Sequence, residues 1–427
     1  MSTKTRWLTI VLAAGLLLGF GLIGASAAPS NGSPPQHPYL SPEIIISDFN
    51  NKEILPDIAY NSKHNEYLVV WHTTGTAATR TVRGARISAN GQMLANFQIN
   101  GHPSKDSVQP SVAYDPVHDH YLTVFLFDAA GDGSNMDLLG RLIPWEGPDP
   151  NLNSFLISDW STHQWTPEVA YGRAVEEFLV VWANEYQSGA LPMYISGRRV
   201  RAADGSFFGS GSDLTINHPS QNRVNPAVTY NLARNEYLVI YDNGLDILGT
   251  RYTGHIDHDF GGEFAIAGWP DAETIPDVAA CYEADQYLVT WQSLQGGTND
   301  AIYGRFLDGS AKPGNVYQID DTTSAERAAS VSCNDAGTRY LVAWQTEYTN
   351  LKFGVWARFV SPNEQLGPLF AVQEPFNQSH RTNPAVAGGR TDYLSVWEDE
   401  RGNTGFWDIH GRLITPYANF IPIVRSP

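Results

Sequence analysis

One short aromatic run, EYLVVW at residues 66–71, returns six times and constrains the fold of this chain more than any other feature. The later copies are HYLTVF from 120, EFLVVW from 177, EYLVIY from 236, QYLVTW from 286, RYLVAW from 339 and DYLSVW from 392. Successive copies are 54, 57, 59, 50, 53 and 53 residues apart. A period in this range is typical of a repeat architecture, in which each unit needs its neighbours to bury its faces.

Each repeat contains the signals of four short strands. In the first copy, PDIAY at 56–60 indicates a strand with Pro at its first position, where a missing N–H is tolerated. After the polar turn NSKHN, EYLVVW is nearly continuously apolar, which indicates a strand covered on both faces. TVRGARI at 81–87 predicts a third strand, and FQI at 97–99, which follows an Asn-Gly turn, predicts a fourth.

Four antiparallel strands in a unit of about 50 residues match the blade of a β-propeller. The fold class is therefore all-β, a seven-bladed β-propeller of four-stranded antiparallel blades over residues 43–427. Its repeats start near residues 56, 110, 167, 226, 276, 329 and 384. Two segments compete for the fourth-strand position of the last blade, IIIS at 44–47 and the apolar tail at 419–424, and the sequence does not decide between them.

The repeats resemble those of bacterial exported propeller proteins built from tandem P-x-V-A-Y, YLVVW, D-I-Y-G-R and F-x-I elements. The nearest copy of that pattern is WEDERGNTGFWDIHGR at 397–412, and the resemblance covers nearly all of the chain after residue 42. This group is defined by its repeat rather than by an activity, so the resemblance implies the fold and export but no catalytic residues.

The N-terminal 42 residues read as a separate region. Lys4 and Arg6 precede an apolar run at 8–24 and the small residues Ala25-Ser26-Ala27, which is the layout of a cleaved signal peptide over 1–27. An uncleaved anchor is the alternative, although the run is short for a membrane span. Residues 28–42 are rich in Pro and Ser and predict a tether. We expect a secreted, extracellular monomer with no membrane span in the mature chain.

The net charge is −18, and it becomes −20 when residues 1–27, which carry two basic and no acidic side chains, are removed. Such a balance argues against nucleic acid and anionic membrane surfaces as partners, because both need a basic footprint. The two cysteines, Cys281 and Cys333, end the first strands of two adjacent repeats, so we expect either a structural disulfide or two buried thiols.

An arginine follows Gly, Ala or Thr in the third strand of six repeats, at Arg141, Arg198, Arg251, Arg305, Arg358 and Arg412. A ring of these side chains would suit an anion. Because buried charges need partners, we expect instead a structural pairing with the residue before the second-strand aromatic. Examples of that residue are Glu66, Glu177, Glu236 and Asp392.

The loops between strands two and three and the connections between blades open on one face, where sites on rigid scaffolds usually lie. They carry aromatic rings and acids that suit sugars, since rings stack on apolar sugar faces while carboxylates accept hydroxyl protons. The candidate ligand-binding residues are Trp160, Trp165, Trp269, Phe376, Glu398 and Asp399. The alternative is that these tryptophans fill the seams between blades.

The loop DAAGDGSNMD offers oxygen atoms at Asp128, Asp132, Asn135 and Asp137. Calcium binds through six to eight oxygens, but the spacing departs from the known calcium loop. We expect a solvated acidic loop, with Ca²⁺ as the alternative and no other cofactor.

Signatures of known hydrolases and metal sites, such as G-x-S-x-G and H-E-x-x-H, are absent from the sequence. We therefore expect no catalytic residue and a binding module for a glycan or cell-surface polymer. The alternatives are an extracellular glycoside hydrolase or lyase that uses two loop carboxylates, and a scaffold for a protein partner.

Overall fold

The fold is described from a computed structural model. It describes residues 37–416 except 50, 75–78, 134, 188–189, 209–212, 218–221, 254–260, 295–299, 321, 323, 349–351, 374–379 and 401–404. The predicted signal peptide, most of the predicted tether, Phe376 and the tail at 419–424 lie outside these residues.

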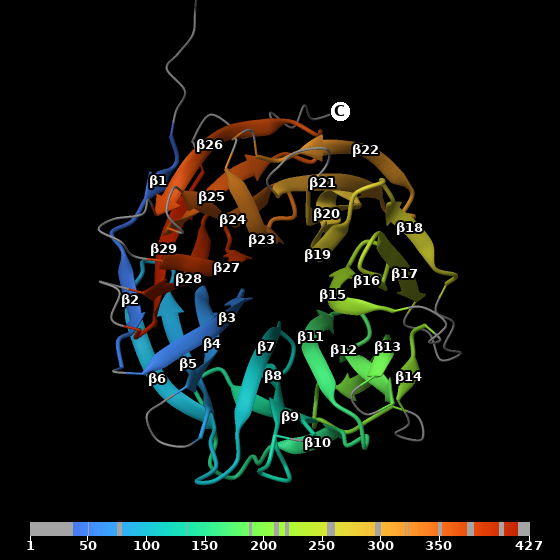
Figure 1. Cartoon of the computed structure of the whole chain (residues 1–427). Coiled ribbons are helices and arrows are strands. Elements are labelled where there is room, and N and C mark those ends of the chain that lie inside the picture. The colour runs from blue at the N-terminus through green and yellow to red at the C-terminus, as the bar shows by residue number, and fades with distance from the viewer. Residues whose placement is uncertain are drawn as a thin grey trace, which may run out of the picture. The chain divides into compact units, whose positions relative to one another are not determined.

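Seven antiparallel sheets form a ring, so the predicted seven-bladed β-propeller is confirmed (Figure 1). The innermost strands are β3 (Lys52–Asn61), β7 (Ser107–Asp115), β11 (Gln164–Gly172), β15 (Val224–Asn231), β19 (Glu273–Cys281), β23 (Ala325–Cys333) and β27 (His380–Gly388). The second strands are β4 (Glu66–Thr74), β8 (His120–Phe127), β12 (Glu177–Gln187), β16 (Glu236–Asp242), β20 (Gln286–Ser293), β24 (Tyr340–Tyr348) and β28 (Tyr393–Glu400).

The two outer layers complete each blade. The third strands are β5 (Thr81–Ser88), β9 (Asp137–Pro144), β13 (Ala190–Arg201), β17 (Ile247–Thr253), β21 (Ala301–Asp308), β25 (Lys352–Val360) and β29 (Asp408–Thr415). The outermost strands are β6 (Met93–Asn100), β10 (Phe155–Ser158), β14 (Leu214–Thr215), β18 (Phe264–Ala267), β22 (Pro313–Gln318) and β26 (Leu366–Gln373). A short 3-10 helix, η1 (Tyr282–Ala284), follows β19. Among the described residues, no helix is long and apolar enough to span a bilayer.

The N-terminal segment closes the ring. Strand β2 (Ile44–Ser47) pairs with β29 and takes the outermost position of the last blade, so the blue and red ends of the chain meet in Figure 1. Strand β1 (Tyr39–Leu40) also pairs with β29, so the end of the predicted tether belongs to the last blade. Ile46 is 2% exposed and packs with the core between the last and first blades, whereas its neighbour Ile45 is 53% exposed.

The second strands form the core, as their apolar runs predict. All side chains of EYLVVW are buried, and Tyr67 and Trp71 have no exposed surface. The phenol groups extend this packing from blade to blade, since Tyr393 Oη donates to the carbonyl of Arg339 at 2.7 Å and Tyr340 Oη to that of Gln286 at 3.0 Å. Neighbouring blades are thus joined both by apolar contact and by hydrogen bonds.

The innermost strands begin earlier than predicted. Strand β3 starts at Lys52 and passes through a bulge at Leu55 and Pro56, so the proline is inside the strand rather than at its start. The residue before this proline, or before Ala329 in the sixth blade, has a positive φ in all seven blades: Leu55, Gln109, Thr166, Asn225, Ile275, Ala328 and Asn383. A bulge leaves one residue unpaired, so it accommodates a proline without a ladder N–H.

The recurrent arginines form structural contacts, as expected. The predicted pairing with the residue before the second-strand aromatic is found for one of the six, Arg251. Arg251 pairs with Glu236, whereas Arg412 donates to the carbonyl of Val372 in the preceding blade at 3.0 Å. Arg141, Arg305 and Arg358 likewise donate to carbonyls of the preceding blade's outer segment, those of Ile99, Ile266 and Ile319. Arg198 pairs with Asp213.

The structure joins Cys281 and Cys333 in a disulfide, with Cα atoms 5.5 Å apart. The bond links the ends of the innermost strands of two adjacent blades, at the face opposite the one where those strands begin.

Candidate functional site

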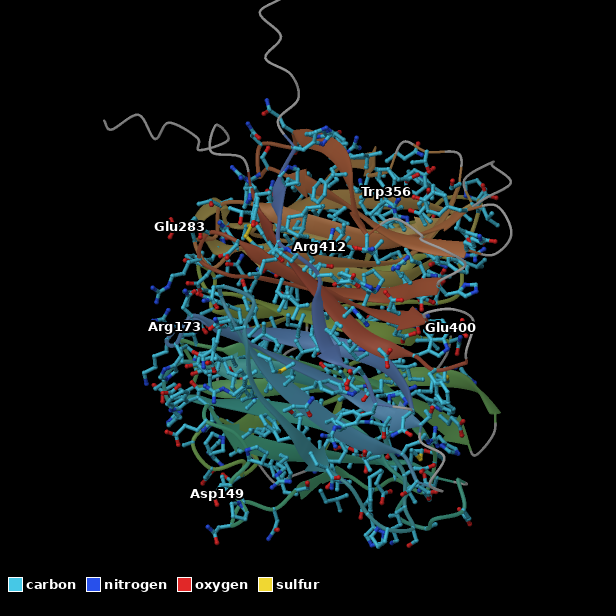
Figure 2. All side chains as sticks on the ribbon, turned by 90° about the vertical axis from the view of Figure 1, so that its left-hand side faces the viewer. Asp149, Arg173, Glu283, Trp356, Glu400 and Arg412 are labelled. Atoms are coloured by element: carbon cyan, nitrogen blue, oxygen red, sulfur yellow. A yellow bond between two sulfur atoms is a disulfide. The ribbon has the colours of Figure 1, made fainter. Side chains whose placement is uncertain are left out.

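The mouth of the ring is the face on which the innermost strands begin and the second strands end. Figure 2 shows both faces of the ring edge-on. Glu400, the last residue of β28, lies at the face that forms the mouth, and Arg173 and Glu283, which follow innermost strands, lie at the opposite face. The strand ends from which the variable loops predicted to hold the site leave are on the side of Glu400.

Exposed aromatic rings gather on the mouth between the second and third blades. Trp160 is 50% exposed, Trp165 is 38% exposed and Tyr186 at the end of β12 is 54% exposed. His163 stands beside them, with its ring centroid 5.3 Å from that of Trp165. We call Trp160, His163, Trp165 and Tyr186 the aromatic platform. Large exposed rings next to one another are typical of a binding surface.

Hydrogen bonds hold the platform in place. The indole N–H of Trp160 donates to the Asp213 carboxylate, and that of Trp165 donates to Glu185 at 3.4 Å. Asn135 of the acidic loop donates its amide N–H to the Trp160 carbonyl at 2.9 Å. Trp160 and Trp165, predicted as ligand-binding residues, and the acidic loop, for which Ca²⁺ was the alternative reading, are therefore joined by these contacts. Tyr186 and Asp213 were missed, because the pairing that brings them here involves strands far apart in sequence, whereas Asp159 directly precedes Trp160 in the chain.

The acidic loop uses its first carboxylate to hold its own backbone. Asp128 is buried and accepts hydrogen bonds from the amides of Gly131 and Gly133 at 2.7 and 2.8 Å. Asp137 is half-buried, and burial, followed by the charges of Asp159 and Asp128, raises the pKa of its carboxyl. The loop thus combines a capped turn with a carboxyl group that holds its proton more tightly than usual.

Among the described residues, one group of three side chains brings possible metal ligands within 4.8 Å of one another: Glu43, Asp399 and His410. Each already has a partner inside the protein. His410 Nδ1 lies 2.9 Å from Glu43, and Asp399 accepts from the Arg381 guanidinium at 3.0 Å. The buried guanidinium opposes a cation here, and the contacts tie the N-terminal segment to the last blade.

Two further predicted ligand-binding residues pack between blades, Trp269 partly buried and Glu398 buried. Trp269 packs its ring against Tyr303 at 5.2 Å and Trp291 at 6.2 Å, in the seam between the fourth and fifth blades. Glu398 is buried and accepts hydrogen bonds from the Leu55 amide at 2.7 Å and the Asn383 side chain at 2.8 Å. Both residues therefore connect blades, whereas Asp399 pairs with Arg381 inside the last blade.

Sequence reasoning also missed a set of carboxylates around the central channel. Asp57, Glu168 and Asp277 each follow the bulge proline of an innermost strand. The charges of Asp57 and Asp277 add to the effect of burial in raising the pKa of Glu168, and the charge of Asp57 does the same for Asp277. They come from the first, third and fifth blades, so they face a common axis. Burial raises the pKa of Asp277 to about 6. Because Ser111 donates to Glu168 at 3.1 Å and the Val112 amide to Asp57 at 2.8 Å, these groups also link blades.

A hollow of about 460 Å³ lies away from the mouth, between the outer strands of the fourth blade and the hairpin of the fifth. Its lining is mostly small and apolar, and its one charged group, Arg251, is paired with Glu236. It therefore has fewer polar groups for binding a ligand than the aromatic platform and its surroundings have.

No protein-family model matches the chain, and no curated protein matches it. Among solved structures it is similar to a fungal alcohol oxidase of the AA5 family in complex with copper, at 10% identity over 89% of this chain and 77% of that one, with a TM-score of 0.56. It is also similar to puromycin hydrolase, at 11% identity over 84% and 51% of the two chains, with a TM-score of 0.54. Similarity at these identities shows the fold alone.

Proposed function

We propose that this chain is a secreted binding module whose ligand is a glycan that stacks on Trp160 and Trp165 at the mouth of the propeller. The observation that carries the proposal is the pair of exposed indole rings whose N–H groups are held by carboxylates. Rings fixed before the ligand arrives lose little conformational freedom on binding, and this preorganisation favours affinity.

The surroundings of the rings support a sugar ligand. Asp159, which directly precedes Trp160, is exposed, and its carboxylate oxygens can accept hydrogen bonds from hydroxyl groups. Stacking faces combined with a few placed polar groups are what sugar recognition requires.

Hydrolysis of the bound glycan is the second candidate, and one observation favours it. Asp137 stands next to the platform with a raised pKa, and Asp159 and Asp128 are close enough to contribute to that shift. A carboxyl with a raised pKa close to a second carboxyl is the arrangement that glycoside hydrolysis uses.

Binding and hydrolysis can be separated in one experiment. Bacterial and plant polysaccharides are titrated into the protein while tryptophan fluorescence is followed, and reducing sugar is assayed in the same tubes. Saturable quenching that is lost in Trp160→Ala and Trp165→Ala, without sugar release, supports the binding module. Trp145→Ala is the matched control, because Trp145 stacks on His64 on the opposite face at 3.8 Å.

Sugar release that disappears in Asp137→Asn would assign hydrolysis to this face. Quenching that survives both platform variants would place the ligand elsewhere on the ring. An absence of any response across the polysaccharides would overturn the proposal and favour a protein partner.

A further inference from the structure

We infer that the glycan taken by the aromatic platform carries protonated amino groups, as polymers of deacetylated glucosamine do. This inference rests on the proposed function and adds the chemical class of the sugar. It comes from the charges around the rings, from the rings themselves and from buried acceptor atoms under them.

Carboxylates outnumber cations around the platform. The contacts and charges described above connect five acids to it: Asp128, Asp137, Asp159, Glu185 and Asp213. The cations that the same contacts bring in are Lys105, whose charge acts on Asp137, and Arg198, which is paired with Asp213. Sialic acids and uronic acids would meet this negative surface with like charge, so it selects against them.

The acids around Asp137 repel one another more than the nearby cation compensates. Burial and the charges of Asp159 and Asp128 raise the pKa of Asp137, and the charge of Lys105 lowers it by less than any of these raises it. A positive group placed here would relieve the repulsion between these carboxylates, which a neutral hydroxyl would not do.

The exposed rings suit the same positive group. An ammonium over the face of an indole is attracted by the ring quadrupole, and tryptophan is the best of the aromatic side chains for this contact. Trp160 and Trp165 each combine an open ring face with a carboxylate at the indole nitrogen. A glucosamine unit presents both a stacking face and an ammonium group, so it matches both features at once.

A third observation is independent of charge. Gln164 is fully buried beneath the platform, and its Oε1 has no hydrogen-bond partner within the described part of the chain. Asn135 Oδ1, in the loop that holds Trp160, is buried and without a partner in the same part of the chain. Both atoms are amide oxygens, which only accept hydrogen bonds, whereas an ammonium group donates three and accepts none.

The test compares three oligosaccharides of equal length by calorimetry: one of glucosamine, one of N-acetylglucosamine and one of galacturonic acid. We expect the glucosamine oligomer to bind about tenfold more tightly than the acetylated one, as a few exposed ion pairs would give. The difference is expected to shrink in about 1 M NaCl, because salt screens exposed charges.

Variants divide the site into charge and stacking. Asp159→Asn is expected to weaken binding of the glucosamine oligomer and to leave that of the acetylated oligomer nearly unchanged. Trp160→Ala is expected to weaken both. Asp204→Asn is the matched control, since Asp204 is an exposed aspartate in a hairpin of the third blade, at the opposite face.

The outcomes separate this inference from the function on which it rests. Equal affinity for the charged and acetylated oligomers, with both lost in Trp160→Ala, would overturn the amino-sugar inference and leave the glycan-binding module standing. Tighter binding of the galacturonic acid oligomer would overturn it as well. Binding of none of the three, with no response to other glycans, would overturn both.

Discussion

The indole nitrogen of Trp71 lies 2.9 Å from the carboxylate of Glu53, and neither side chain has any exposed surface. Glu53 stands three residues before the bulge proline of its strand, and Glu273 and Glu326 occupy the same position in the fifth and sixth blades. Burial raises the pKa of Glu53 to about 7 and that of Glu273 to about 7. Burial and the charge of Asp320 also raise the pKa of Glu326.

These carboxyls predict a pH dependence of stability with a definite sign. A carboxyl whose pKa is near 4.5 in the unfolded chain and about 7 in the fold keeps its proton longer when folded. Its stabilising effect is therefore complete below pH 4.5 and is lost as pH rises to about 7. Titration of one such group changes the free energy of unfolding by about 3 kcal/mol between these pH limits.

We expect the unfolding temperature to fall as pH rises from about 5 to about 7.5. Glu53→Gln should flatten this slope, because the amide oxygen still accepts from Trp71 but no longer titrates. Calorimetry across this range checks it, and an unchanged slope in the variant would contradict the assignment. At lower pH, Glu263 and Asp285 act in the opposite sense, since Arg223 and Arg234 lower their pKa values.

Closure of the ring by the N-terminal strand predicts opposite results for two adjacent isoleucines. Ile46→Ala should lower the free energy of unfolding by about 2–4 kcal/mol, because it removes a buried side chain from the core between the first and last blades. Ile45→Ala should change it by less than about 0.5 kcal/mol, since that side chain is exposed. Urea denaturation of both variants measures the difference. Equal effects would mean that β2 does not close the ring as described.

The bond between Cys281 and Cys333 predicts that a reducing agent destabilises the fold. The bond closes a loop across 52 residues of sequence, and constraint of the unfolded chain on this scale corresponds to about 2–4 kcal/mol. The double variant Cys281→Ala and Cys333→Ala should unfold at a lower guanidinium concentration than the oxidised protein. It should also be insensitive to reductant, whereas sensitivity in the variant would point to another cause.

The architecture could be predicted from the sequence because the same signals occur in every repeat. The partners of the third-strand arginines could not, because a difference of one residue in strand register changes which group each arginine meets. Arg141 lies opposite Thr123, the second residue after the strand-two aromatic, while Arg251 lies opposite Leu238, the first. A shift by one residue moves a side chain to the other face of the sheet. Arg251 therefore meets the carboxylate of its own blade, and Arg141 meets a carbonyl of the preceding blade.

The bulge before each proline was missed for a related reason. A positive φ at Leu55 or Ile275 has no signal in the residue type, because side chains of this kind rarely adopt it. The candidate site was predicted in part. Its loops were expected to open on one face, but the contacts of Trp160 with Asn135 and Asp213 depend on how two blades fit together.

Trp160 and Trp269 give the sharpest contrast, since each lies two residues after an outermost strand, β10 or β18, and yet their surroundings differ. Trp269 rests on Trp291 and Tyr303, so Trp269→Ala should cost about 2–4 kcal/mol of unfolding free energy. Trp160 is half exposed, so Trp160→Ala should cost less than about 1 kcal/mol while it removes glycan binding.

Thermal unfolding and glycan titration of both variants test whether stability and affinity are affected separately. Trp269→Ala should lower the unfolding temperature and, at a temperature where it remains folded, keep the affinity of the parent protein. Trp160→Ala should do the reverse. Loss of affinity in both variants would mean that the seam between the fourth and fifth blades shapes the mouth, because Trp269 packs in that seam and would then affect the ligand through the loops that it supports.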